Sequence, residues 1–212
     1  MPTSIGPGRL TVSVATSPQA VLWLGHGAGG GIGAVDLTAL ANVLPDRGIT
    51  VARYEQPWRV AGKKVAARPA TLDVAWLETV PSIRVLAAGL PIIVGGRSAG
   101  ARVACRTADD IGAAGVVCLA FPLHPPGRPE VTRLDELLTP TVPVLVLQGD
   151  RDTFGTASDV RSDAAGHDTI RVVDVAGADH GMKVLKSSPL RASDVAALVT
   201  ASVGDFITDR VI

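Results

Sequence analysis

Aromatic residues and net charge are both scarce in this sequence. Aromatic side chains make up 3% of the 212 residues, and 20 Lys and Arg residues balance 20 Asp and Glu residues. Proteins that bind nucleic acids need a basic face, and those that bind single strands add aromatic stacking platforms. We therefore expect no nucleic-acid partner.

Long apolar runs are also missing. No stretch approaches the roughly 20 apolar residues that span a bilayer. The N-terminal residues MPTSIGPGRL do not combine a basic segment with an apolar one, as a secretory signal does. We expect a cytoplasmic protein with no membrane partner.

Only two cysteines occur, Cys105 and Cys118, and they are not in C-x-x-C spacing. Two such thiols build neither a metal site nor a disulfide framework. We expect both to be buried as small apolar residues, and we expect no metal.

Short apolar runs alternate with helical patterns along the chain. Strands are expected over residues 10–15, 20–24, 49–54, 91–94, 115–121, 142–147 and 169–175. Helices are expected over residues 36–47, 71–89 with a break near Pro81, 98–106 and 190–208. Strands that are apolar throughout and alternate with helices are typical of a parallel sheet covered on both faces. The sequence predicts one α/β domain over residues 1–212, with its ligand site at the carboxyl edge of the sheet, near the irregular segments 56–69 and 122–140.

The segment IIVGGRSAGARV, residues 92–103, contains a G-x-S-x-G pattern between a strand and a helix. A serine at such a bend is strained, and its neighbours must be small because strand and helix nearly touch there. Gly96 and Gly100 meet that need, which makes Ser98 a candidate nucleophile. A helix N-cap serine in a glycine-containing turn explains the pattern alone equally well, but the flanking strand and helix favour the nucleophile.

A nucleophilic serine needs a base and an acid that orients the base. Asp152 and His180 each follow a predicted strand, so both should lie near Ser98 at the same sheet edge. Asp150 is the alternative acid, but Asp152 lies further beyond its strand and should reach the histidine more easily. The other histidines, which we expect in connectors or loops, are His26, His124 and His167.

A glycine-rich loop, GHGAGGG at residues 25–31, follows the apolar run AVLWL. Small residues let backbone N–H groups approach a developing oxyanion. We expect the N–H groups of Ala28 and Ala99 to form the oxyanion hole, with Gly29 as the alternative to Ala28. A dinucleotide site remains open as another interpretation, because the acidic Glu55 lies just after the next predicted strand. No Lys-Ser or Lys-Thr follows the loop, so it is not a P-loop.

Taken together, HGAGG, GGRSAGARVA, FPLHPPG, LQGDRDTFG and GADHGMK make the chain resemble the α/β-hydrolase superfamily. Within it, these motifs look like the small cap-less hydrolases related to dienelactone hydrolase, and more closely the group of testis-expressed and chromatin-complex-subunit relatives. The resemblance runs from about Val21 to the C-terminus. It implies a three-layer α/β/α fold with a mostly parallel sheet, a Ser-His-Asp triad, no large lid domain, and neither metal nor organic cofactor.

The expected activity is that of a serine hydrolase acting on an ester or thioester of a small-molecule acyl substrate, as a monomer or small homo-oligomer. Loops after the strands should form the pocket. Four aromatic residues near strand ends, Tyr54, Trp58, Phe121 and Phe154, are candidates for an apolar acyl-binding wall, with His124 at the rim. A non-catalytic binding or scaffold protein on the same fold is the alternative.

Overall fold

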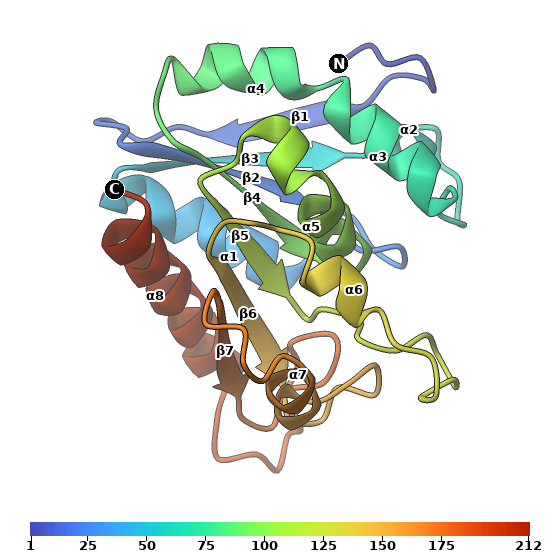
Figure 1. Ribbon diagram of the computed structural model, residues 1–212. Coiled ribbons are helices and arrows are strands. Elements are labelled where there is room, and N and C mark those ends of the chain that lie inside the picture. The colour runs from blue at the N-terminus through green and yellow to red at the C-terminus, as the bar shows by residue number, and fades with distance from the viewer.

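A seven-stranded sheet forms the centre of the computed structural model, which describes all residues 1–212. Its strand order is β1-β3-β2-β4-β5-β6-β7, and only β1 runs antiparallel to its neighbour (Figure 1). The strands are β1 (Arg9–Ser13), β2 (Ala20–Gly25), β3 (Ile49–Glu55), β4 (Ile92–Arg97), β5 (Gly115–Leu119), β6 (Val144–Gly149) and β7 (Ile170–Val175). The expected mostly parallel α/β architecture is confirmed.

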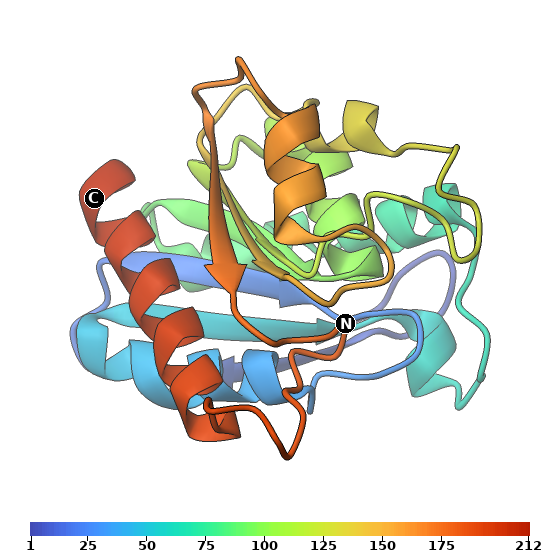
Figure 2. The same ribbon diagram turned by 90° about the horizontal axis from the view of Figure 1, so that it is seen from below.

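Helices cover both faces of this sheet. They are α1 (Val35–Val43), the 3-10 turn η1 (Leu44–Arg47), α2 (Pro57–Val60), α3 (Pro69–Leu77), α4 (Val80–Ala87), α5 (Ala99–Ile111), α6 (Leu134–Leu137), α7 (Ala157–Asp163) and α8 (Ala192–Arg210). Figure 2 shows α1 and α8 side by side on one face, with α3, α4, α5 and α7 on the other. None of these helices is both long and apolar enough to span a membrane.

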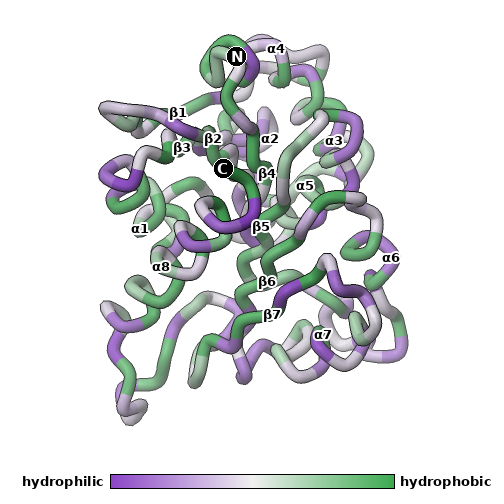
Figure 3. The backbone as a smooth tube through the Cα atoms, turned by 60° about the vertical axis from the view of Figure 1, so that its left-hand side comes forward, coloured by the Kyte–Doolittle hydropathy of each residue, from purple (hydrophilic) through white to green (hydrophobic).

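The core is divided by the sheet into two clusters, and alternate strand residues contribute to each. In β2, Leu22 and Leu24 belong to the cluster under α1 and α8. Val21 and Trp23 belong to the cluster under α3, α4 and α5. A strand buried on both faces must be apolar at every position, which explains the continuous hydrophobic colouring of β5 and β6 in Figure 3.

Two of the predicted helices are interrupted by proline. The helix expected over residues 36–47 ends as α1 at Val43 and continues as a 3-10 turn, with Pro45 near the start of that turn. The break expected near Pro81 is confirmed: this segment forms two helices, α3 and α4, and Pro81 lies in the first turn of α4. Proline fits the first turn of a helix, where its missing N–H has no acceptor to lose.

Three helices arise where none was predicted. The short α2 and α6 lie in the segments expected to be irregular, and α7 begins at a capping box in which Thr156 and Asp159 bind each other's backbone N–H. Strand β5 ends at Leu119, two residues before the predicted end, because Ala120 adopts a left-handed conformation with φ 50°. The two cysteines are buried as predicted, with 3.4 Å between their sulfur atoms. The hydrogen bond with Cys105, together with burial, raises the pKa of Cys118.

Strands β2 and β4 and the start of α5 meet at three glycines. An added Cβ at Gly100 would lie 2.5 Å from the carbonyl carbon of Gly25, and one at Gly96 would lie 2.5 Å from the Gly25 oxygen. Both contacts are with backbone, which cannot rotate away. The close approach of strand and helix expected from the sequence is therefore present.

We predict that Gly100→Ala lowers the free energy of unfolding by about 2 kcal/mol or more, since the methyl group must displace backbone in the core. Equilibrium unfolding in urea measures this change. Gly33→Ala is the matched control, because a Cβ there would meet nothing within 4 Å. Equal stability of the two variants would contradict the steric explanation.

Candidate active site

Ser98 lies at the junction between β4 and α5. Its backbone has φ 52° and ψ −112°, a conformation that residues with a side chain rarely adopt. Its N–H donates to the carbonyl of Leu119 on β5, at 3.0 Å. The hydrogen bond to the neighbouring strand stabilises this strained conformation, and Gly96 and Gly100 leave the room that it needs.

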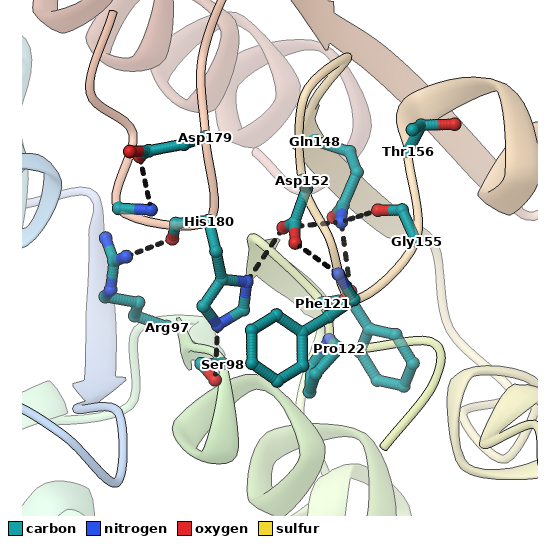
Figure 4. Close-up of polar contacts among 12 residues, drawn as sticks. Arg97, Ser98, Phe121, Pro122, Gln148, Asp152, Gly155, Thr156, Asp179 and His180 are labelled. Carbon is teal, nitrogen blue, oxygen red and sulfur yellow. Dashed lines mark hydrogen bonds and ion pairs between the residues drawn. The ribbon is translucent and has the colours of Figure 1, made fainter. Parts of the chain in front are cut away.

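His180 and Asp152 reach Ser98 from the loops that follow β7 and β6. The Nε2 atom of His180 is 2.9 Å from the Ser98 hydroxyl oxygen, and its Nδ1 atom is 2.8 Å from Oδ2 of Asp152 (Figure 4). The Asp152 side chain is completely buried, whereas 22% of the His180 side chain is exposed. An acid on Nδ1 holds the proton there and leaves Nε2 free to accept the serine proton.

The alternative acid and the other histidines have different partners. Oδ1 of Asp150 accepts a hydrogen bond from the backbone N–H of Gly177 at 2.8 Å. His167 is exposed, and the Nδ1 atom of His124 lies 3.0 Å from the carbonyl of Val131. The structure therefore brings together Ser98, Asp152 and His180, the three residues expected to form the triad.

Gln148, near the end of β6, holds the Asp152 carboxylate in place. Its amide nitrogen is 3.0 Å from Oδ2 of Asp152 and also lies within hydrogen-bond distance of the carbonyls of Phe121 and Gly155. The N–H of Phe154 donates to the other carboxylate oxygen at 2.8 Å. These donors fix the buried carboxylate in the orientation that faces His180. A polar residue ending the apolar run VLVLQ is the sequence signal for this role.

Arg97 supports the histidine from the opposite side. One guanidinium nitrogen is 2.8 Å from the buried carboxylate of Asp36 on α1, and another donates to the backbone carbonyl of His180. Arg97, which directly precedes Ser98, thus connects β4 and α1 to the loop that carries His180 (Figure 4). Sequence reasoning missed this connection, although an arginine inside a G-x-S-x-G motif is an unusual residue for a crowded bend.

The glycine-rich loop lies against Ser98. A Cβ on Gly27 would be 3.5 Å from the Cβ of Ser98, and both Ala28 and Ala99 line one small cavity beside the serine. No acceptor within the protein pairs with the N–H of Ala28, and Ala99 is the first residue of α5, where an N–H has no intrahelical acceptor. Both N–H groups are available to an oxyanion.

Glu55, the residue that kept a dinucleotide site open, forms an ion pair with Arg9 at 3.3 Å. The ion pair occupies the carboxylate that a dinucleotide site would need in order to bind the ribose hydroxyls. No group of three or more His, Cys, Asp or Glu side chains is arranged to hold a metal ion.

His26 anchors the glycine-rich loop to the end of β3. Its Nδ1–H donates to the carbonyl of Gly27 at 2.9 Å, and its Nε2 accepts from the backbone N–H of Gln56 at 3.2 Å. Burial lowers the pKa of His26, with nearby Arg59 acting in the same direction and Gly27 and Glu55 opposing it. The neutral ring is the form that satisfies both hydrogen bonds, so this histidine has a structural role.

The candidate pocket residues lie at different depths. Trp58 lines the cavity shared by Ala28 and Ala99, and the ring of Phe154 is 4.2 Å from that of His180. Phe121 and Tyr54 are fully buried in the core under α3 and α5, and the Tyr54 hydroxyl donates to the carbonyl of Ala75. His124 is half-buried in the loop after β5.

We predict that the protein loses stability as the pH falls below the ordinary histidine pKa of 6.5. Since folding lowers the pKa of His26, the unfolded chain binds a proton at a higher pH than the native protein does. The free energy of unfolding, measured in urea between pH 7.5 and 5, should therefore decrease with falling pH. His26→Asn should reduce this dependence and the exposed-site control His167→Asn should not; identical slopes in the two variants would refute the assignment.

Three solved structures share this arrangement of elements. An α/β serine hydrolase homologue from Coxiella burnetii aligns with a TM-score of 0.77 at 16% identity, over 96% of this chain and 95% of that chain. Est1E from Butyrivibrio proteoclasticus gives 0.75 at 14% identity, over 96% and 94%. An α/β serine hydrolase without lid from Xanthomonas campestris gives 0.72 at 18% identity, over 95% and 90%.

The lidless fold expected from the sequence agrees with these structures, whereas the narrower resemblance to the testis-expressed group stays a prediction. A family model described as alpha/beta hydrolase domain matches residues 18–208, which include every element from β2 to nearly the end of α8. The chain belongs to the alpha/beta hydrolase domain family.

Proposed function

We propose that the protein is a serine hydrolase that cleaves a carboxylic ester or thioester through an acyl-enzyme. The observation that carries this proposal is the unbroken hydrogen-bond chain from the Ser98 hydroxyl through His180 to Asp152. A serine at an ordinary helix N-cap has no need of a histidine on its hydroxyl or of a buried acid behind that histidine.

In the proposed reaction, His180 Nε2 takes the proton of Ser98 while the serine oxygen attacks the acyl carbonyl. The resulting oxyanion is held by the N–H groups of Ala28 and Ala99, each worth roughly two to three orders of magnitude in rate. His180 then gives its proton to the leaving alcohol or thiol, which departs. Water attacks the acyl-enzyme with His180 again as base, and the acid product leaves with Ser98 restored.

Asp152 orients the imidazole and stabilises its protonated form. Its two oxygens accept hydrogen bonds from Gln148 and Phe154 as well as from His180, and these bonds hold the carboxylate against the imidazole. The structural neighbours support the same chemistry by analogy, since they include Thermogutta terrifontis esterase 2 phosphorylated by paraoxon, with a TM-score of 0.68 at 15% identity.

We predict that a fluorophosphonate probe or paraoxon modifies Ser98 and that Ser98→Ala abolishes both this labelling and ester hydrolysis. Intact-protein mass spectrometry and hydrolysis of p-nitrophenyl acetate measure the two effects. Ser193→Ala, on the exposed first turn of α8, is the matched control and should be labelled like the wild type. Full labelling of Ser98→Ala would remove Ser98 from the role, and an inert wild-type protein would favour a non-catalytic scaffold.

We predict that Asp152→Asn lowers kcat by roughly four orders of magnitude, because an amide favours the wrong histidine tautomer. Asp150→Asn keeps an oxygen that can accept from the backbone N–H of Gly177 and should change kcat less than tenfold. Steady-state kinetics on variants of equal melting temperature make this comparison. The opposite ranking would transfer the role of acid to Asp150.

A further inference from the structure

The phenyl ring of Phe154 lies against the imidazole of His180. The two ring centroids are 4.2 Å apart, and the ring planes are inclined by 34°. Because carbon atoms in contact stay about 3.5–4.0 Å apart, rings whose centroids are this close must overlap face to face and cannot meet at their edges. The phenyl ring therefore covers part of one face of the imidazole.

Phe154 belongs to the same turn as Asp152, the acid of the candidate triad. The backbone N–H of Phe154 donates to Oδ1 of Asp152 at 2.8 Å, and Asp side chains commonly make such bonds to the backbone two residues further on. Oδ2 of the same carboxylate is 2.8 Å from Nδ1 of His180. One turn thus contacts the imidazole twice, at Nδ1 through the carboxylate and on its face through the phenyl ring.

Neighbouring loops hold the backbone of this turn in place. The carbonyl of Phe154 accepts a hydrogen bond from the N–H of His124 at 2.8 Å, and the amide of Gln148 donates to the carbonyl of Gly155 at 2.6 Å. Gly155 has φ 119°, and a Cβ there would lie 2.8 Å from the Cβ of Leu123. The loop after β5 therefore packs directly against the turn and fixes where the Phe154 ring starts.

The hydrogen bonds of the imidazole alone leave its tilt less restricted than its position. They join Nδ1 to Asp152 and Nε2 to Ser98, and a tilt of the ring about the line through these two nitrogens changes neither distance much. Such a tilt does turn the lone pair of Nε2 away from the serine proton. A ring packed on the face of the imidazole opposes this motion, which matters because 22% of the His180 side chain is exposed.

We propose that Phe154 is a positioning residue, whose ring holds the plane of the His180 imidazole so that both ring nitrogens stay directed at their partners. The proposal rests on the hydrolase function above and adds a residue to its machinery. It differs from the acyl-binding wall expected for Phe154 from the sequence. A wall acts on the binding of the acyl group and depends on its length, whereas a positioning ring acts on proton transfer whatever the acyl group.

Replacement of the ring by an apolar side chain that is not planar tests this role. In Phe154→Leu we expect kcat for p-nitrophenyl acetate to fall tenfold or more, because small misalignments of a reacting group are costly. KM should change less than threefold, since His180 serves both acylation and deacylation. The loss in kcat should be the same for the butyrate ester. Phe154→Tyr keeps the ring and should retain kcat within threefold of the wild type.

Two further measurements separate alignment from stability. The imidazole C–H proton signals of His180, identified by their absence in His180→Ala, should shift in Phe154→Leu and stay near their wild-type positions in Phe154→Tyr, because only a ring over the imidazole face shields them. Phe206→Leu is the matched control: Phe206 is buried in the cluster under α1 and α8. This variant should lower the melting temperature without lowering the kcat of the folded protein.

A loss in kcat smaller than tenfold in Phe154→Leu overturns the positioning role. A loss that grows with acyl length overturns it in favour of the wall, and an equal loss in Phe154→Tyr overturns it because the ring is then not what counts. Should Phe154→Leu fail to fold, Phe154→Met replaces it. Failure of the hydrolase function itself is distinguishable, since wild-type protein would then neither react with fluorophosphonate nor hydrolyse any ester.

Discussion

The contact of backbone with backbone where β2, β4 and α5 meet is the constraint on which the site depends. Gly25, Gly96 and Gly100 leave no room for a Cβ between them, so the chain turns from strand to helix within one residue. Ser98 occupies that residue at φ 52°. Packing over the whole sheet holds the strain in place, and the result is a hydroxyl that stands above the strand ends while the first N–H groups of α5 face the same point.

Side chains from different parts of the fold position Asp152 and His180, the two residues connected to Ser98. Asp152 is held by Gln148 at the end of β6, and the His180 backbone is held by Arg97 through Asp36 on α1. His180 is therefore held both by the hydrogen bond of its imidazole to Asp152 and by the hydrogen bond of its backbone carbonyl to Arg97. Because Arg97 directly precedes Ser98 in the chain and donates to the backbone carbonyl of His180, it helps to fix the position of His180 relative to Ser98.

Much of the fold was predictable because its signals are local. Apolar runs at regular spacing and the G-x-S-x-G bend gave the strands and the order of Ser98, Asp152 and His180, since parallel strand ends share one edge. The link between Arg97 and Asp36 could not be predicted, because it joins residues 61 positions apart and depends on how α1 packs. The helix predicted over 36–47 is present, but its last residues, from Leu44 to Arg47, form a 3-10 turn that contains Pro45. The apolar spacing that predicted the helix does not register the effect of a single proline. Tyr54 and Phe121 illustrate a further limit, since a position near a strand end does not tell whether a side chain faces the ligand or the core.

The tryptophans of this aromatic-poor chain lie near the small cavity that Ala28 and Ala99 line. Trp23 stacks on Trp76 with 3.6 Å between ring centroids, and Trp58 lies against His26 at 5.5 Å, so all three tryptophans of the chain gather behind the glycine-rich loop. Rigid indoles with two rotatable bonds each give a wall that does not widen easily. His26 connects the glycine-rich loop to the backbone of Gln56, so tightly packed and hydrogen-bonded groups determine the size of the space beside Ser98. Groups that are already held in place need no reorganisation when a molecule enters the cavity, so binding there does not include the free-energy cost of ordering them.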